Sequence, residues 1–161
     1  TIVEQTKAII PQNHLHYRSL VLETNGSTFY VEQTPIQIIE ANCLDNGCTY
    51  EGRRTAVKKR LEFKRKIPIP ISRLHSIYTF PTHSTTNPNC IWIFPQHISH
   101  MDEQLLENLP SNHTKVTFRD GTILSLDVSY YVMKKQVERT MACRQFFSGY
   151  DPKAVINQTF V

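Results

Sequence analysis

The sequence predicts an α+β fold, a single β-rich antiparallel domain with hairpins and one long C-terminal helix. Two turn dipeptides, Asn25-Gly26 and Asp120-Gly121, each lie between apolar segments. Both tolerate the positive φ angles that a type I′ hairpin turn requires. An apolar stripe with helical spacing begins at Tyr130. A chain of 161 residues corresponds to about one domain, which we place over residues 14–150.

The N-terminal third is expected to hold short extended segments. Residues 1–13 lack a clear period and are expected to form a loose N-terminal segment. The first hairpin spans residues 15–31, and residues 36–39 (Ile-Gln-Ile-Ile) predict a further short extended piece. Residues 49–63 fit either a short helix or an extended basic arm, because one four-residue apolar spacing does not decide between them.

The middle of the chain alternates strands with loops. Residues 66–71 contain Pro68 and Pro70 and cannot be helical, since each proline forces its predecessor towards extended geometry. Residues 77–80 and 90–94 predict strands. Between them lies a polar loop, residues 82–89, whose hydroxyl and amide groups suit contacts to sugar and phosphate oxygens.

The C-terminal third predicts a second hairpin and then the helix. The hairpin pairs residues 115–118 with residues 123–126, and Ser129 is a suitable N-cap for the helix that follows. Gly149 and Pro152 would end this helix, and residues 151–161 form a short tail. The apolar stripe comprises Tyr130, Met133, Val137 and Met141. The residues expected in the core are Trp92, Phe118, Val137 and Met141.

Positive charge is concentrated in one segment. Residues 53–73 hold nine of the eighteen Lys and Arg residues and one acid, Glu62, which gives this window a net charge of +8. The rest of the chain, with nine cations and thirteen acids, carries −4. A run of like charge is usually a solvated face, but this imbalance favours a surface that binds a polyanion.

Nucleic acid is the polyanion that we expect, because Lys and Arg displace the counterions condensed on DNA. The residues expected to bind phosphates are Arg53, Arg54, Lys58, Lys59, Arg60, Lys64, Arg65 and Lys66. One or two of the arginines would enter the narrow minor groove of A·T-rich DNA. Thr82, Ser84 and Asn87 would add hydrogen bonds to the sugar-phosphate backbone.

Two other classes of function stay open. Cys43, Cys48, Cys90, His97 and His100 could form a zinc site, although no second metal-binding motif supports it. A thiol enzyme would use Cys90, with His83 or His97 as its base. The zinc and thiol sites would belong to an enzyme, which is the first of these classes, and an RNA-binding module is the second. No helix with a short turn precedes the C-terminal helix, so a helix-turn-helix is not expected. We expect no cofactor and no catalysis.

No apolar run approaches the length that spans a bilayer, and the N-terminus lacks the pattern of a signal peptide. We therefore expect a cytoplasmic protein that associates with the nucleoid and not with a membrane.

Several short motifs together resemble a known family, the ComK competence transcription factors of Bacillus, Staphylococcus and Listeria. In order, they are Tyr50-x-Gly52-Arg53, Pro68-x-Pro70-Ile71, Phe80-Pro81-Thr82-x-Ser84, Cys90-x-Trp92-Ile93, Val116-Thr117-Phe118-x-x-Gly121 and Gln136-Val137-x-Arg139-Thr140. The resemblance runs from about Phe29 to Arg144. Each motif is weak alone, but their order and spacing are fairly specific.

The resemblance implies a DNA-binding activator of genes for DNA uptake. Its partners would be paired A·T-rich boxes in duplex DNA, contacted chiefly through the minor groove, further copies of itself in a multimer, and RNA polymerase. Family members are also delivered to a Clp-type protease by an adaptor. The aromatic-Pro-Lys patch associated with that adaptor has no match here, and residues 53–66 are more basic than in relatives.

Overall fold

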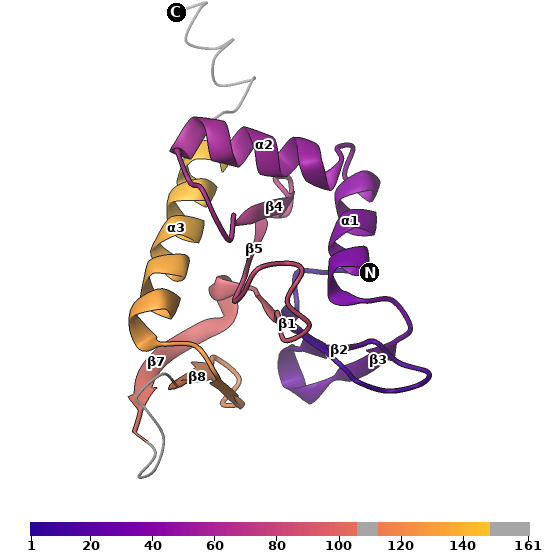
Figure 1. Cartoon of the computed structure of the whole chain (residues 1–161), viewed down its shortest axis with the longest axis vertical. Coiled ribbons are helices and arrows are strands. Elements are labelled where there is room, and N and C mark those ends of the chain that lie inside the picture. The colour runs from indigo at the N-terminus through magenta and orange to yellow at the C-terminus, as the bar shows by residue number, and fades with distance from the viewer. Residues whose placement is uncertain (106–112, 149–161) are drawn as a thin grey trace, which may run out of the picture.

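A computed structural model describes residues 1–105 and 113–148 of the chain. They form a six-stranded antiparallel sheet in the order β3-β2-β1-β6-β5-β4, a three-stranded antiparallel sheet in the order β7-β8-β9, and three α-helices (Figure 1). The predicted α+β class, with antiparallel hairpins and a long C-terminal helix, is confirmed. The strands are β1 Thr6–Pro11, β2 Ser19–Glu23, β3 Thr28–Val31, β4 Ile69–Ser72, β5 Ile77–Pro81, β6 Trp92–Ile93, β7 Ile98–Gln104, β8 His113–Phe118 and β9 Ile123–Leu126.

Both predicted hairpins are present. Strands β2 and β3 pair around a turn in which Asn25 and Gly26 have φ angles of 67° and 79°. Strands β8 and β9 pair around Gly121, whose φ is 87°. Asn25, Gly26 and Gly121 are left-handed as the turn dipeptides predict, whereas Asp120 is not.

The expectation of a loose N-terminal segment is wrong for residues 6–11. Strand β1 lies inside the six-stranded sheet, where Ile9 pairs with Val21 of β2 on one side and Trp92 of β6 on the other. Ala8 and Ile9 are fully buried. The buried Lys7 interrupts the apolar pattern that is typical of a central strand, so the sequence does not predict β1.

The expectation of an extended segment at residues 36–39 is also wrong, because they lie in helix α1, Pro35–Asp45. The Thr34 hydroxyl accepts from the backbone N–H of Gln37, and the Gln37 side chain accepts from the Thr34 N–H. This reciprocal capping box, with Pro35 in the first turn, starts a helix despite the β-branched residues that follow.

The sequence left a short helix or an extended arm open for residues 49–63, and the structure shows the helix. Helix α2, Tyr50–Leu61, begins at Thr49, whose hydroxyl accepts from Gly52 N–H at 2.9 Å. It ends at Glu62, which has a left-handed φ of 59°. The predicted strand at residues 90–94 is shorter, with only β6 in regular pairing.

Helix α3, Tyr130–Ser148, follows the second hairpin, and the hydroxyl of Ser129 accepts from Val132 N–H at 3.2 Å. The predicted apolar stripe is only partly right. The buried residues of α3 are Met133, Gln136, Thr140 and Cys143. Val137 is half-buried and Met141 is 48% exposed, so Met141 is not a core residue. Trp92 and Phe118 are buried as expected. Gly149, Pro152 and the predicted tail lie outside the described residues.

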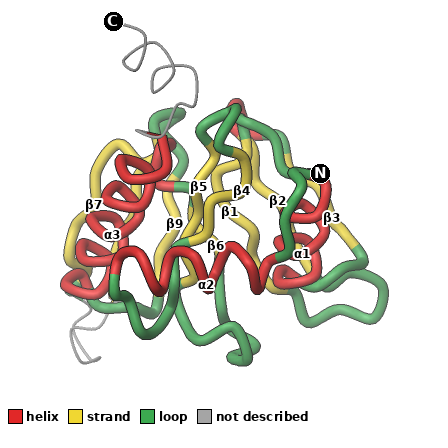
Figure 2. Tube along the Cα trace, turned by 90° about the horizontal axis from the view of Figure 1, so that it is seen from above, coloured by secondary structure: helices red, strands yellow, loops and turns green. Residues whose placement is uncertain are grey.

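The three helices frame the six-stranded sheet, with α1 and α3 at its two sides and α2 across the top in the view of Figure 1. Helix α2 lies between α1 and α3 (Figure 1), and the view from above shows it running across the strands from one helix to the other (Figure 2). Val57 is the one buried residue of α2. Within the described residues, no helix is both long and apolar enough to cross a membrane.

Candidate nucleic-acid interface

The basic segment and the polar loop converge on one hollow of the surface, which we call the cation pocket. Its volume is about 550 Å³. Tyr50 and Arg54 of α2 line one side, the segment after α2 lines another, and the loop between β5 and β6 completes it. The predicted site residues in this lining are Arg54, Lys64, Arg65, Lys66, Ser84 and Asn87. The basic segment and the polar loop, which are separate in the sequence, thus lie side by side in the structure.

The shape of the segment after α2 depends on helix α3. Arg139 donates to the carbonyl of Arg65 at 2.8 Å, and Gln136 donates to the carbonyl of Lys66 at 2.9 Å. The guanidinium of Arg139 also lies over the ring of Phe63, 4.3 Å from its centroid. Because α3 binds the carbonyls, the segment's side chains are left to line the surface hollows.

The polar loop is held by its own hydrogen bonds. Thr82 is 1% exposed, and its hydroxyl accepts from Ile91 N–H at 2.9 Å and bonds the ring of His83 at 2.8 Å. Asn87 N–H donates to the carbonyl of Ser84 at 2.9 Å. Thr82 therefore supports the loop from inside and, contrary to our expectation, is not available to a ligand.

The cation pocket is electropositive. None of its described lining residues is an acid. The nearest carboxylate partner is Glu51, 3.9 Å from Arg54 across one turn of α2, and this exposed contact is weak. Burial raises the pKa of Tyr50 to about 12, although the Arg54 guanidinium opposes the shift. Tyr50 therefore lines the pocket as a neutral phenol that can donate a hydrogen bond.

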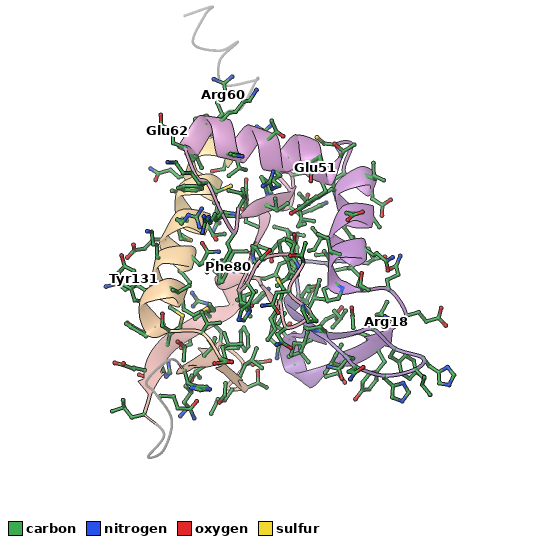
Figure 3. The ribbon with its side chains drawn as sticks, viewed as in Figure 1. Arg18, Glu51, Arg60, Glu62, Phe80 and Tyr131 are labelled. Carbon is green, nitrogen blue, oxygen red and sulfur yellow. The ribbon has the colours of Figure 1, made fainter. Side chains whose placement is uncertain are left out.

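The remaining predicted cations of α2 do not line this pocket. Lys58 follows Arg54 by one turn and so lies on the same helix face. Arg53 lies on the other side, where its guanidinium donates to the carbonyl of Asn46 at 3.1 Å. Arg60 points away from the polar loop (Figure 3). Lys59 is exposed and outside the lining.

Two further hollows share walls with the cation pocket. Lys64, Arg65 and Lys66 also line a hollow of about 600 Å³ against α3, together with Lys135 and Arg139. Thr85 and Asn87 also line a hollow of about 620 Å³ on the other side of the polar loop. The three form one continuous strip of surface. Lys135 and Arg139 in one outer hollow and Arg18 in the other were not predicted as site residues, because they lie far from the basic segment in the sequence.

The metal and thiol readings find no support in the described residues. Within residues 1–105 and 113–148, no group of three or more His, Cys, Asp or Glu side chains could hold a metal ion. Cys90 is buried, and its Sγ lies 3.4 Å from the carbonyl of His83. Burial raises the pKa of this thiol, which is the opposite of what an activated nucleophile needs.

Comparison with known proteins agrees with the motifs. The family model of the ComK protein matches residues 1–150. A protein of Bacillus subtilis (strain 168), the competence transcription factor, is 34% identical over 119 residues, which make up 74% of this chain and 59% of that protein. The chain thus spans less than two thirds of this relative's length. No solved structure matches. Since the family match covers almost the whole chain, the chain belongs to the ComK family.

Proposed function

We propose that this protein is a DNA-binding transcription activator of competence genes. One observation carries the proposal: the cation pocket joins Arg54, Lys64, Arg65 and Lys66 to the hydroxyls and amides of the polar loop, without a carboxylate in the lining. Cations supply the sequence-independent affinity for phosphates, and hydroxyls and amides fix the position of the backbone.

In this proposal the protein binds paired A·T-rich boxes through the minor groove, as a multimer that acts with RNA polymerase in the cytoplasm. The narrow minor groove of A-tracts has the strongest negative potential, and Arg side chains enter it most readily. Arg54 and Arg65, both in the cation pocket, are the candidates for this insertion.

Salt dependence tests which face binds DNA. Each phosphate contact contributes about −0.9 to the slope of log affinity against log salt, so contacts from Arg54, Lys64, Arg65 and Lys66 give a slope of about −3.6. Replacing two contacts, in a Lys64→Ala/Arg65→Ala variant, should weaken binding and reduce the slope by about 2. Fluorescence anisotropy of a labelled duplex at several salt concentrations measures both.

The matched control is a Lys59→Ala/Arg60→Ala variant, which loses the same charge from positions outside the pocket lining. Its slope should stay close to that of the unsubstituted protein. Equal changes in the two variants would mean that charge alone, rather than the cation pocket, determines binding. No change in either variant would remove this face from the interface.

Competition between nucleic acids tests the ligand class. An A·T-rich duplex should displace the label at lower concentration than a G·C-rich duplex or a structured RNA, because A-form RNA lacks the narrow A·T minor groove. Displacement by RNA at the lowest concentration would instead favour the RNA-binding reading.

A further inference from the structure

The hollow on the far side of the polar loop, which we call the amide pocket, differs in chemistry from the cation pocket. Three separate parts of the chain line it: residues 11–13 with Arg18, residues 34–36, and residues 85–90 with Trp92. Four of its side chains are amides, namely Gln12, Asn13, Asn87 and Asn89. Arg18 is its one charged lining residue.

Several polar side chains of the amide pocket have no partner in the part of the chain that the structure describes. Within the described residues, the side chains of Asn13, Arg18 and Asn89 make no hydrogen bond or ion pair. Asn13 and Arg18 are exposed, as is Asn89. Each amide offers both a donor and an acceptor, whereas a lysine or arginine offers donors only. The pocket can therefore bind a ligand that presents both kinds of group.

The backbone of the amide pocket is well ordered by hydrogen bonds. Gln12 N–H donates to the carbonyl of Arg18 at 2.9 Å. On the opposite wall, Cys90 N–H donates to the carbonyl of Asn87 at 3.1 Å, and Asn89 N–H donates to Asn87 Oδ1 at 2.8 Å. Both walls are thus fixed before a ligand arrives, which lowers the entropy cost of binding.

The amide pocket adjoins the cation pocket, because the two share one wall. Thr85 and Asn87 line both it and the cation pocket, so a long ligand in one extends over the other. Figure 3 places Tyr131, which lines the hollow against α3, and Arg18 on opposite sides of the molecule. The strip therefore crosses the width of the molecule, as a duplex would require.

We propose that the amide pocket contacts the base edges of A·T pairs and so sets the sequence preference of the protein. This inference rests on the proposed DNA-binding function. Contacts to phosphates carry no sequence information, whereas amides on base edges do. Asn and Gln form paired hydrogen bonds with adenine in the major groove, and Asn, Gln and Arg distinguish A·T from G·C pairs in the minor groove. A single cation among the lining residues suits base edges better than a row of phosphates.

An Asn13→Ala/Asn89→Ala variant tests the proposal, because neither side chain has a structural partner among the described residues. Asn87 is left intact, since its Oδ1 supports the loop. The readout is the ratio of affinities for an A·T-rich and a G·C-rich duplex of equal length, with the salt slope of each. The ratio should fall about 5- to 150-fold for each amide that no longer bonds a base edge, while the slope stays unchanged. An Arg18→Ala variant should also reduce the ratio.

Two controls separate this inference from the proposed function. A Gln33→Ala/Gln145→Ala variant, in which two exposed residues outside the amide pocket are changed, should keep the ratio. The Lys64→Ala/Lys66→Ala variant removes two lining cations and keeps Arg54 and Arg65, so it should weaken both duplexes alike. If that variant loses affinity while the Asn13/Asn89 variant keeps the full ratio, the amide pocket does not contact bases, and the DNA-binding function stands. If the Asn13/Asn89 variant loses affinity equally for both duplexes, its contacts are to the backbone and the inference is overturned.

Discussion

Replacing Asp120 with Asn tests the ion pair that joins the two sheets. Lys7 of β1 is buried, with a side chain 3% exposed, and its Nζ lies 2.7 Å from Asp120 Oδ2 in the β8–β9 turn. The same Nζ donates to the hydroxyl of Thr122 at 2.9 Å and lies 5.4 Å from the centroid of the Phe118 ring. The Asp120→Asn variant keeps the size of the side chain and removes the charge that neutralises Lys7.

The expected loss of unfolding free energy depends on the Lys7 charge, which stays buried without its partner after the substitution. Removing one partner of a buried pair leaves an uncompensated charge and typically costs about 3–5 kcal/mol. The lower end, about 3 kcal/mol, applies here because the Asp120 side chain is 11% exposed. For a protein of this size, such a loss lowers the Tm by roughly 6–12 °C. Urea unfolding followed by circular dichroism measures the free energy of unfolding directly.

The dependence of stability on pH provides a second measurement. The Lys7 hydrogen bond, followed by bonds from Thr122, holds the pKa of Asp120 well below its usual 3.8. Its folded-state pKa is depressed, so the contribution of Asp120 is complete above the unfolded value. It is lost as the pH falls from about 4 towards the folded value. The unsubstituted protein should therefore lose stability over this range more steeply than the Asp120→Asn variant does.

Two comparisons decide the outcome. Asp127→Asn removes a carboxylate that is 82% exposed beside His113, and it should change stability by less than about 0.5 kcal/mol. A Lys7→Met/Asp120→Asn variant removes both charges and should recover at least half of the loss, because no buried charge is left unpaired. A loss below about 1 kcal/mol in the single variant, or no recovery in the double variant, would refute this account of the sheet junction.

Three further predictions concern stability and thiol reactivity. Met133→Ala should cost about 2–5 kcal/mol, whereas Met141→Ala, at a residue 48% exposed, should cost less than about 0.5 kcal/mol by urea unfolding. Thr34→Ala removes the capping box of α1 and should cost about 1 kcal/mol in the same assay. Burial raises the pKa of the Cys143 thiol to about 12, so at pH 8 it stays protonated. Mass spectrometry should find the exposed Cys48 alkylated by iodoacetamide well before Cys143, and the reverse order would contradict this burial.

Local chemistry was enough to predict the hairpins. The β2–β3 turn has two residues with a positive φ, Asn25 and Gly26, and the β8–β9 turn has one, Gly121. Helix α1 also had a local signal, since Thr34 and Gln37 have the spacing of a capping box. The β-branched residues at positions 36–39 concealed it, because strand propensity and a helix start gave opposite indications.

The position of β1 could not be predicted from neighbouring residues. Lys7 makes the segment look like an exposed strand or a loop, and its partner Asp120 lies 113 positions away. A buried lysine is stable only when paired, so the pairing that makes β1 a central strand exists only in the complete fold.

Only part of the candidate site could be predicted from the sequence, for a related reason. The run of cations is local, but its meeting with the polar loop depends on α3, whose Gln136 donates to the carbonyl of Lys66, 70 positions away, and to that of Pro81, 55 positions away. The apolar stripe predicts that Val137 and Met141 face the core, whereas Gln136 and Thr140 are buried there beside Met133 and Cys143. The buried face of α3 therefore combines apolar packing with polar contacts. Because Gln136 binds the basic segment and the last residue of β5 at once, this side chain of α3 also fixes the start of the polar loop beside the cations.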